Sequence, residues 1–224
     1  MIALLRYQTA ILFRSQRWVF PLISYVLLIS VAGIGGRGAI GDGLDWSAAM
    51  LVPVVALLTR SMLTAEPAEA RAVVAAASGP GRAQLAVLLT ALAGAAVLAL
   101  AGASYELGTT GDVSVLLHDH PGALASTLAA GLGKALICAF VGSAVGTFFN
   151  PPVIRHQVVA VLSTISAVVL GLVLSVSPAS AALRGSGAAV QSASWPAGMP
   201  FLVAALLLVT SWLLSAALAA RRGA

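Results

Sequence analysis

The stretch from Ala83 to Tyr105 reads AQLAVLLTALAGAAVLALAGASY and contains no charged side chain. A helix needs about 20 mostly apolar residues to cross the hydrocarbon core of a bilayer, and this stretch is longer than that. The rest of the chain is similar, since 60% of its 224 residues are hydrophobic and only 8% are charged. Soluble domains carry roughly 25% charged residues. The composition therefore excludes a soluble or disordered chain and predicts an all-α integral membrane domain.

Six apolar stretches are long enough to span a membrane. The predicted spans are residues 18–36, 46–65, 83–105, 121–149, 157–177 and 200–220. The second span contains Pro53, which removes a backbone donor, although neighbouring membrane helices can accommodate such a residue. The first span follows several arginines, as a signal peptide would, but its apolar run is longer than usual and no clear cleavage site follows. We therefore expect a retained helix.

The distribution of arginines predicts the orientation of the chain, because cytoplasmic loops are enriched in basic residues. With the N-terminus inside, only Arg37 and Arg184 fall outside. The arginines on the cytoplasmic side are Arg6, Arg14, Arg17, Arg60, Arg71, Arg82, Arg155, Arg221 and Arg222. The acidic residues expected in the outer loops are Asp42, Asp45, Glu106, Asp112 and Asp119. Six spans then return the C-terminus to the cytoplasm.

Residues 1–17 form a separate amphipathic segment ahead of the spans. Arg6, Arg14 and Arg17 fall on one face of a helix, with leucines and an isoleucine on the other. This pattern predicts a helix that lies in the inner membrane interface with its arginines towards anionic headgroups. The alternative interpretation is an irregular cytoplasmic extension of the first span.

Residues 66–82 form the longest cytoplasmic connection. Pro67 suits a first helical turn, and Glu66 and Glu69 suit the positive end of a helix dipole. The run from Pro67 to Ala77 is rich in helix-forming residues, and the segment 78–81, Ser-Gly-Pro-Gly, ends it. We expect a short helix of about three turns on the cytoplasmic face.

Lys134 lies near the middle of the fourth predicted span. A charge at that depth costs at least about 2.5–3.5 kcal/mol, so such residues usually mark function. The functional interpretations are a contact with an anionic substrate group or an ion pair inside a translocation path. The structural interpretation is a snorkelling or neutral amine, and the sequence does not distinguish them.

Gly142 and Gly146 are four residues apart in the same span, a spacing that lets helices approach closely. They predict helix packing, either within the chain or between protomers. His118, Asp119 and His120 are of metal-ligating types, but no third strong ligand accompanies the two histidines, so a solvated loop is favoured over a metal site. Cys138 is the single cysteine, which excludes an intrachain disulfide.

Motifs for catalysis are missing from the chain. It contains no phosphate-binding G-x-x-x-x-G-K-[ST], no H-E-x-x-H and no G-x-S-x-G pattern. No acidic residue falls inside a predicted span, which argues against a proton-coupled carrier. We expect no catalytic residue, no metal and no cofactor in this chain, and any ATP hydrolysis must occur on a partner.

The layout resembles the ABC-2 type permease, the membrane subunit of an ATP-binding-cassette exporter. The resemblance rests on the arginine-bearing N-terminal helix, the six spans and the helical loop between the second and third spans. The segments 59–63, Thr-Arg-Ser-Met-Leu, 66–71, Glu-Pro-Ala-Glu-Ala-Arg, and 81–83, Gly-Arg-Ala, are similar to actinobacterial members of the family.

The resemblance implies a homodimer, or a pairing with a related permease, that works with separate ATPase subunits carrying ATP and Mg²⁺. The coupling contact to the ATPase would include Glu66, Glu69, Arg71 and Arg82. The substrate would be amphipathic, such as an antibiotic, lipid or peptide, and the location the bacterial plasma membrane. The alternative functions are a membrane scaffold or assembly factor without transport activity and, with less support, a secondary carrier.

Overall fold

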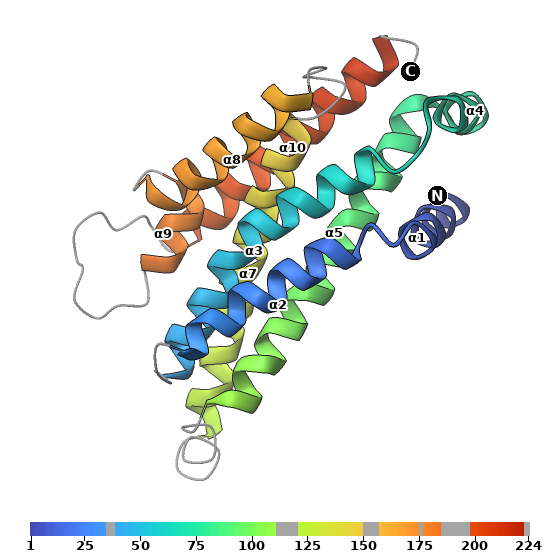
Figure 1. Cartoon of the computed structure of the whole chain (residues 1–224). Coiled ribbons are helices and arrows are strands. Elements are labelled where there is room, and N and C mark those ends of the chain that lie inside the picture. Colours follow the sequence, from blue (N-terminus) through green and yellow to red (C-terminus); the bar gives the residue numbers. More distant parts are fainter. Residues whose placement is uncertain (35–38, 111–120, 150–156, 175–176, 185–197, 222–224) are drawn as a thin grey trace.

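A computed structural model describes residues 1–34, 39–110, 121–149, 157–174, 177–184 and 198–221 of the chain. These residues are almost entirely helical and contain no strand, so the predicted all-α class is confirmed (Figure 1). The helices are α1 (Ile2–Arg14), α2 (Val19–Ile34), α3 (Ile40–Leu63), α4 (Ala68–Ser78), α5 (Pro80–Thr109), α7 (Pro121–Phe148), α8 (Gln157–Val173), α9 (Pro178–Arg184) and α10 (Met199–Arg221).

Helix α3 forms the centre of the bundle. It packs most extensively against α7, then against α5 and α2, while α10 packs against α7 and α5. Ala48, Leu51, Val52, Val54 and Val55 of α3 are fully buried. Other helices therefore cover most of α3, although Trp46 remains 38% exposed.

Several helices are long and apolar enough to cross a bilayer. These five stretches of the described chain are Ile40–Leu63, Pro80–Thr109, Leu124–Phe148, Val159–Leu183, which runs over two residues outside the described set, and Met199–Leu218. Helix α2 corresponds to the first predicted span but has 16 residues, about 24 Å of helix, which is less than the roughly 30 Å of a hydrocarbon core. The exposed surfaces of α8 and α10 carry many leucines and valines, which suit contact with lipid.

Helices α1 and α4 lie across one end of the bundle and are seen nearly end-on in Figure 1. We call this end the α1–α4 end, and α10 also finishes there. The prediction placed a helix over residues 67–77, and α4 covers Ala68–Ser78 with Pro67 at its N-cap. The break before α5 is a single residue, Gly79 with φ of 87°, because Pro80 already occupies the first turn of α5.

The opposite end of the bundle differs from the prediction. Helix α3 begins at Ile40, not at residue 46, and α5 continues to Thr109, beyond residue 105. Asp42, Asp45 and Glu106, which were expected outside the spans, therefore lie in helices that continue beyond the predicted spans. Acidic residues lower the local hydropathy without ending a helix, so a search for uncharged runs stops too early.

Candidate functional site

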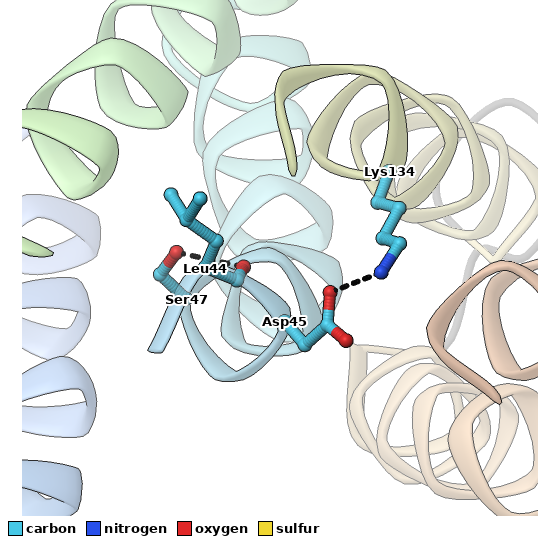
Figure 2. A network of polar contacts seen from close by, with 4 residues as sticks. All are labelled: Leu44, Asp45, Ser47 and Lys134. Atoms are coloured by element: carbon cyan, nitrogen blue, oxygen red, sulfur yellow. Dashed lines mark hydrogen bonds and ion pairs between the residues drawn. The ribbon is translucent and has the colours of Figure 1, made fainter. Parts of the chain in front are cut away.

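An ion pair joins the beginning of α3 to the middle of α7. The Lys134 ammonium donates a hydrogen bond to Asp45 Oδ1 over 2.6 Å, and the two side chains are 16% and 17% exposed. Figure 2 shows Lys134 extending from α7 towards Asp45 on α3. Lys134 therefore has a partner of opposite charge within the same chain. Part of each charged side chain therefore stays open to a ligand.

Close contact between the two helices sets up this pair. A Cβ atom added at Gly131 would stand 2.8 Å from Leu44 Cδ1 and 3.0 Å from Leu44 Cβ, so a larger residue there would displace Leu44 or push α7 away from α3. Lys134 follows Gly131 by three residues and Asp45 follows Leu44 directly, and residues three apart lie on one side of a helix. The glycine therefore brings the ammonium within reach of the carboxylate.

A cleft of about 470 Å³ opens beside the ion pair. We call it the ion-pair cleft. Its lining consists of Gly41, Leu44, Asp45, Ser126, Thr127, Ala130, Gly131 and Lys134. Only two of these residues are charged, and small side chains make up much of the wall. A hollow of this size with a few polar groups fits the usual description of a small-ligand site.

Gly142 and Gly146 form a second close contact of α7 with α3. A Cβ atom at Gly142 would meet Val52 O at 2.6 Å, and one at Gly146 would meet Ala56 O at 2.7 Å. These neighbours are backbone atoms, which cannot rotate away as a side-chain end would. Of the two packing arrangements left open by the sequence, the described structure places this pair inside the chain.

Glu106 is a buried acid that the sequence analysis did not identify as a candidate site. Its side chain is 7% exposed, and Oε1 has no hydrogen-bond partner among the described residues. The carboxyl group packs against α3 at Gly43, where an added Cβ atom would overlap it. Buried polar groups without partners are rare. The available signal was the helix-compatible segment 105–109, which extends the third span past Glu106.

Glu66, the first of the predicted coupling residues, faces the protein. Its carboxylate accepts hydrogen bonds from Tyr7 Oη at 2.9 Å and Gln8 Nε2 at 3.5 Å, and the residue is 7% exposed. The hydrogen bond to Glu66 raises the pKa of Tyr7 above its ordinary value, because the phenol donates to the carboxylate. Glu66 therefore attaches α1 to the connection between α3 and α4.

Two arginines hold the end of α3. Arg71 Nη2 donates to the backbone oxygens of Leu63 at 2.8 Å and Glu66 at 3.1 Å. Arg17 Nη1 donates to Thr64 O at 2.7 Å. Carbonyls at the end of a helix lack partners within the helix, and cationic side chains satisfy them well. Among the predicted residues of this end, Glu69, Arg82, Arg6 and Arg14 are exposed.

Helix α1 turns its apolar side towards the bundle. Leu12 is part of the main core, and Gln8 is buried beside it. Phe13 is exposed on the arginine-bearing side and makes an edge-on contact with Trp18. The helix ends before Gln16, whose φ of 53° turns the chain towards α2. The predicted apolar face is thus present, and protein covers the part that carries Leu12.

Removing the Glu66 carboxylate should release α1. We expect Glu66→Ala to speed trypsin cleavage after the exposed Arg14 about tenfold, because hydrogen bonds to a charged acceptor are among the stronger ones and their loss favours local opening. The measurement is the rate of appearance of the cleaved N-terminal peptide from detergent-solubilised protein. Glu69→Ala removes the same charge from an exposed position and serves as the control. Equal cleavage rates in both variants would show that Glu66 does not hold α1.

The described residues contain no group of three or more potential metal ligands. His118, Asp119 and His120 lie outside the described residues, as does Arg155. Cys138 is buried in the core as a free thiol.

No known protein family, curated protein or solved structure matches the chain. The class of protein therefore follows from the structure itself. Its long apolar helices, their packing around α3 and the lipid-compatible outer surface define an all-helical, multi-pass membrane protein.

Proposed function

We propose that this chain is the membrane subunit of an ABC exporter, driven by a separate ATPase subunit and assembled as a dimer. In this proposal the chain crosses a bacterial plasma membrane six times, with both termini and the α1–α4 end in the cytoplasm. The substrate is amphipathic, and ATP and Mg²⁺ bind the partner ATPase. The observation that best supports the proposal is the way in which α4 is connected to α3 and α5.

Helix α4 is connected to the bundle on both sides. Arg71 ties its first turns to the end of α3, and Gly79 alone separates it from α5, which runs for 30 residues through the bundle. A displacement of α4 would therefore move two of the central helices together. Packed elements of this kind switch between discrete arrangements and do not deform continuously, which suits the transmission of a push from a partner.

The outer face of α4 is suitable for docking. Its exposed residues recur at the spacing of one helical face and are Glu69, Ala72, Val73, Ala76 and Ala77. Val73 is 70% exposed and is surrounded by alanines, so a groove on a partner could approach the helix closely. Glu69 and Arg82 are exposed at its two ends and offer charges that orient a partner. Of the four predicted coupling residues, these two face outward, whereas Glu66 and Arg71 act within the chain.

The arginines support the orientation. Arg6, Arg14, Arg17, Arg71 and Arg82 all belong to the α1–α4 end, and Arg60 and Arg221 lie in the last turns of the helices that finish there. Basic residues concentrate on the cytoplasmic side of membrane proteins. Helix α1, attached through Glu66, would brace α4 against the load from the ATPase.

The test is purification of the tagged chain from its native host in a mild detergent, with ATPase activity assayed on the eluate. The proposal expects a co-purifying ATPase in matching amount with vanadate-sensitive turnover. An eluate free of ATPase activity would favour the scaffold function instead.

A charge placed on the α4 face should abolish this association. We expect Val73→Asp to reduce the co-purified ATPase activity at least about thirtyfold, because desolvating an unpaired carboxylate at the centre of an interface opposes binding strongly. Gly108→Asp adds the same charge at an exposed position of the opposite end, where an added side chain meets no neighbour, and should retain the ATPase. Full retention by Val73→Asp would contradict a coupling role for α4.

A further inference from the structure

We propose that the ion-pair cleft binds a zwitterionic group that carries an ammonium and a phosphate, as in a phosphoethanolamine headgroup. The ammonium would bind the Asp45 carboxylate, and the phosphate would bind the Lys134 ammonium. The inference concerns binding by this chain alone, so it holds whether or not the chain works with an ATPase.

The charges of the cleft select for a zwitterion. Asp45 and Lys134 are the charged members of the lining, and they cancel each other. A ligand of one sign would draw one of them away and leave the other without its partner in a poorly solvated place. A ligand that carries both charges gives Asp45 a new positive partner and Lys134 a new negative partner. Both side chains are about one-sixth exposed, so a ligand in the cleft can reach them.

The walls provide space and additional polar groups. The small residues Gly41, Ala130 and Gly131 account for the hollow of about 470 Å³, which lies within the roughly 300–1,000 Å³ of typical ligand sites. Ser126 and Thr127 bring hydroxyl groups to the same wall, and hydroxyl and ammonium groups together suit phosphate oxygens. Leu44 adds an apolar surface for the carbon atoms of the ligand.

Asp45 lies near the beginning of α3, and Lys134 lies at the middle of α7. Asp45 follows the first residue of α3, Ile40, by five positions, which is about 8 Å of helix. The headgroup and interfacial layer adds roughly 5–8 Å on each side of the hydrocarbon core. The long side chain of Lys134 reaches Asp45 from a position 13 residues after Pro121, the first residue of α7. A lipid whose tails lie along the exposed apolar surface could place its headgroup in the cleft.

The ammonium group of the ligand should carry hydrogen atoms that it can donate. A primary ammonium donates hydrogen bonds to a carboxylate, whereas the methylated ammonium of a choline headgroup presents only carbon. The cleft should therefore prefer ethanolamine to choline, although both headgroups are zwitterions. This preference distinguishes recognition by Asp45 from general attraction to a lipid surface.

The test compares short-chain phosphatidylethanolamine, phosphatidylcholine and phosphatidylglycerol with identical tails on the full-length protein in detergent. Binding is followed by native mass spectrometry, with water-soluble glycerophosphoethanolamine as a fourth probe. We expect phosphatidylethanolamine to bind about tenfold more tightly than the other two lipids. Binding of the soluble probe as well would identify a headgroup taken from water, and binding of the lipid alone would identify a membrane source. Equal affinity for the three lipids would overturn the proposal.

Two glycine variants test the location without removing a charge. Both Gly41 and Gly133 have open space where a side chain would begin, but only Gly41 lines the cleft. Gly41→Leu should fill the hollow and weaken phosphatidylethanolamine binding about tenfold or more, whereas Gly133→Leu should bind as the wild type does. The charge-free double variant Asp45→Asn with Lys134→Met should lose the preference for ethanolamine over choline. Wild-type binding by Gly41→Leu would show that the lipid sits elsewhere.

Discussion

Gly146→Ala is expected to lower the free energy of unfolding by about 1–3 kcal/mol, although alanine is the better helix former. The added Cβ atom would stand 2.7 Å from Ala56 O and 2.9 Å from Thr59 Cβ. Because the first of these is a backbone atom of the central helix, α7 itself must move away from α3. For a chain of this size the melting temperature should fall by roughly 2–4 °C for each kcal/mol.

The same substitution at Gly133 isolates the steric effect. Gly133 lies in the same helix, but an added Cβ atom there meets no neighbour within 4 Å. Gly133→Ala should therefore stabilise the protein by up to about 1 kcal/mol through helix propensity alone. Thermal unfolding in detergent measures both variants, and Gly142→Ala should behave as Gly146→Ala does, since it faces Val52 O at 2.6 Å. Equal melting temperatures for the Gly133 and Gly146 variants would contradict the close α3–α7 contact.

Lys134→Met and Asp45→Asn should each destabilise the protein by about 3 kcal/mol, the low end of the range for breaking a buried ion pair. The low end applies because each side chain keeps about one-sixth of its surface exposed, which lets water compensate part of the loss. The double variant leaves no charge without a partner. It should therefore be more stable than either single variant, and the two effects should be strongly non-additive.

A double-mutant cycle of unfolding free energies measures this coupling directly. Additive losses would show that the 2.6 Å contact contributes nothing to stability. Transport assays on the same variants address function separately, because unchanged transport of several substrates by the folded double variant would assign the pair to structure. The cycle and the transport assay together distinguish an ion pair that holds α3 to α7 from one that also meets a substrate.

The α1–α4 end shows why charged residues alone do not define a docking surface. Glu66 and Glu69 are equivalent in the sequence, since both are acids near a helix start. In the structure Glu66 is buried against α1, while Glu69 is exposed. The difference arises because the N-terminal helix folds back over the α3–α4 connection, 58 and 59 residues away along the chain. Local sequence carries no record of that contact.

Local signals account for the elements that were predicted well. Pro67 and Gly79 flank α4, Pro121 opens α7, and the apolar run of α10 reaches from Met199 to Arg221. Proline and glycine act on their own backbone, so their effect does not depend on distant residues. The beginning of α3 and the end of α5 depend instead on whether other helices accommodate Asp45 and Glu106, and the uncharged runs in the sequence do not predict these helix ends.

The sequence by itself determined that this is a helical membrane protein and where most helices lie, and it indicated Lys134 as a candidate site and Gly142 and Gly146 as candidates for helix packing. Only the tertiary structure decided that Lys134 faces Asp45, that the two glycines pack on the α3 backbone, and that Glu66 holds α1. The physical reason is that bilayer insertion and helix formation depend on composition and spacing within about 20 residues. Which side chains come into contact depends on how the helices are arranged, and close packing of the helices allows only one arrangement.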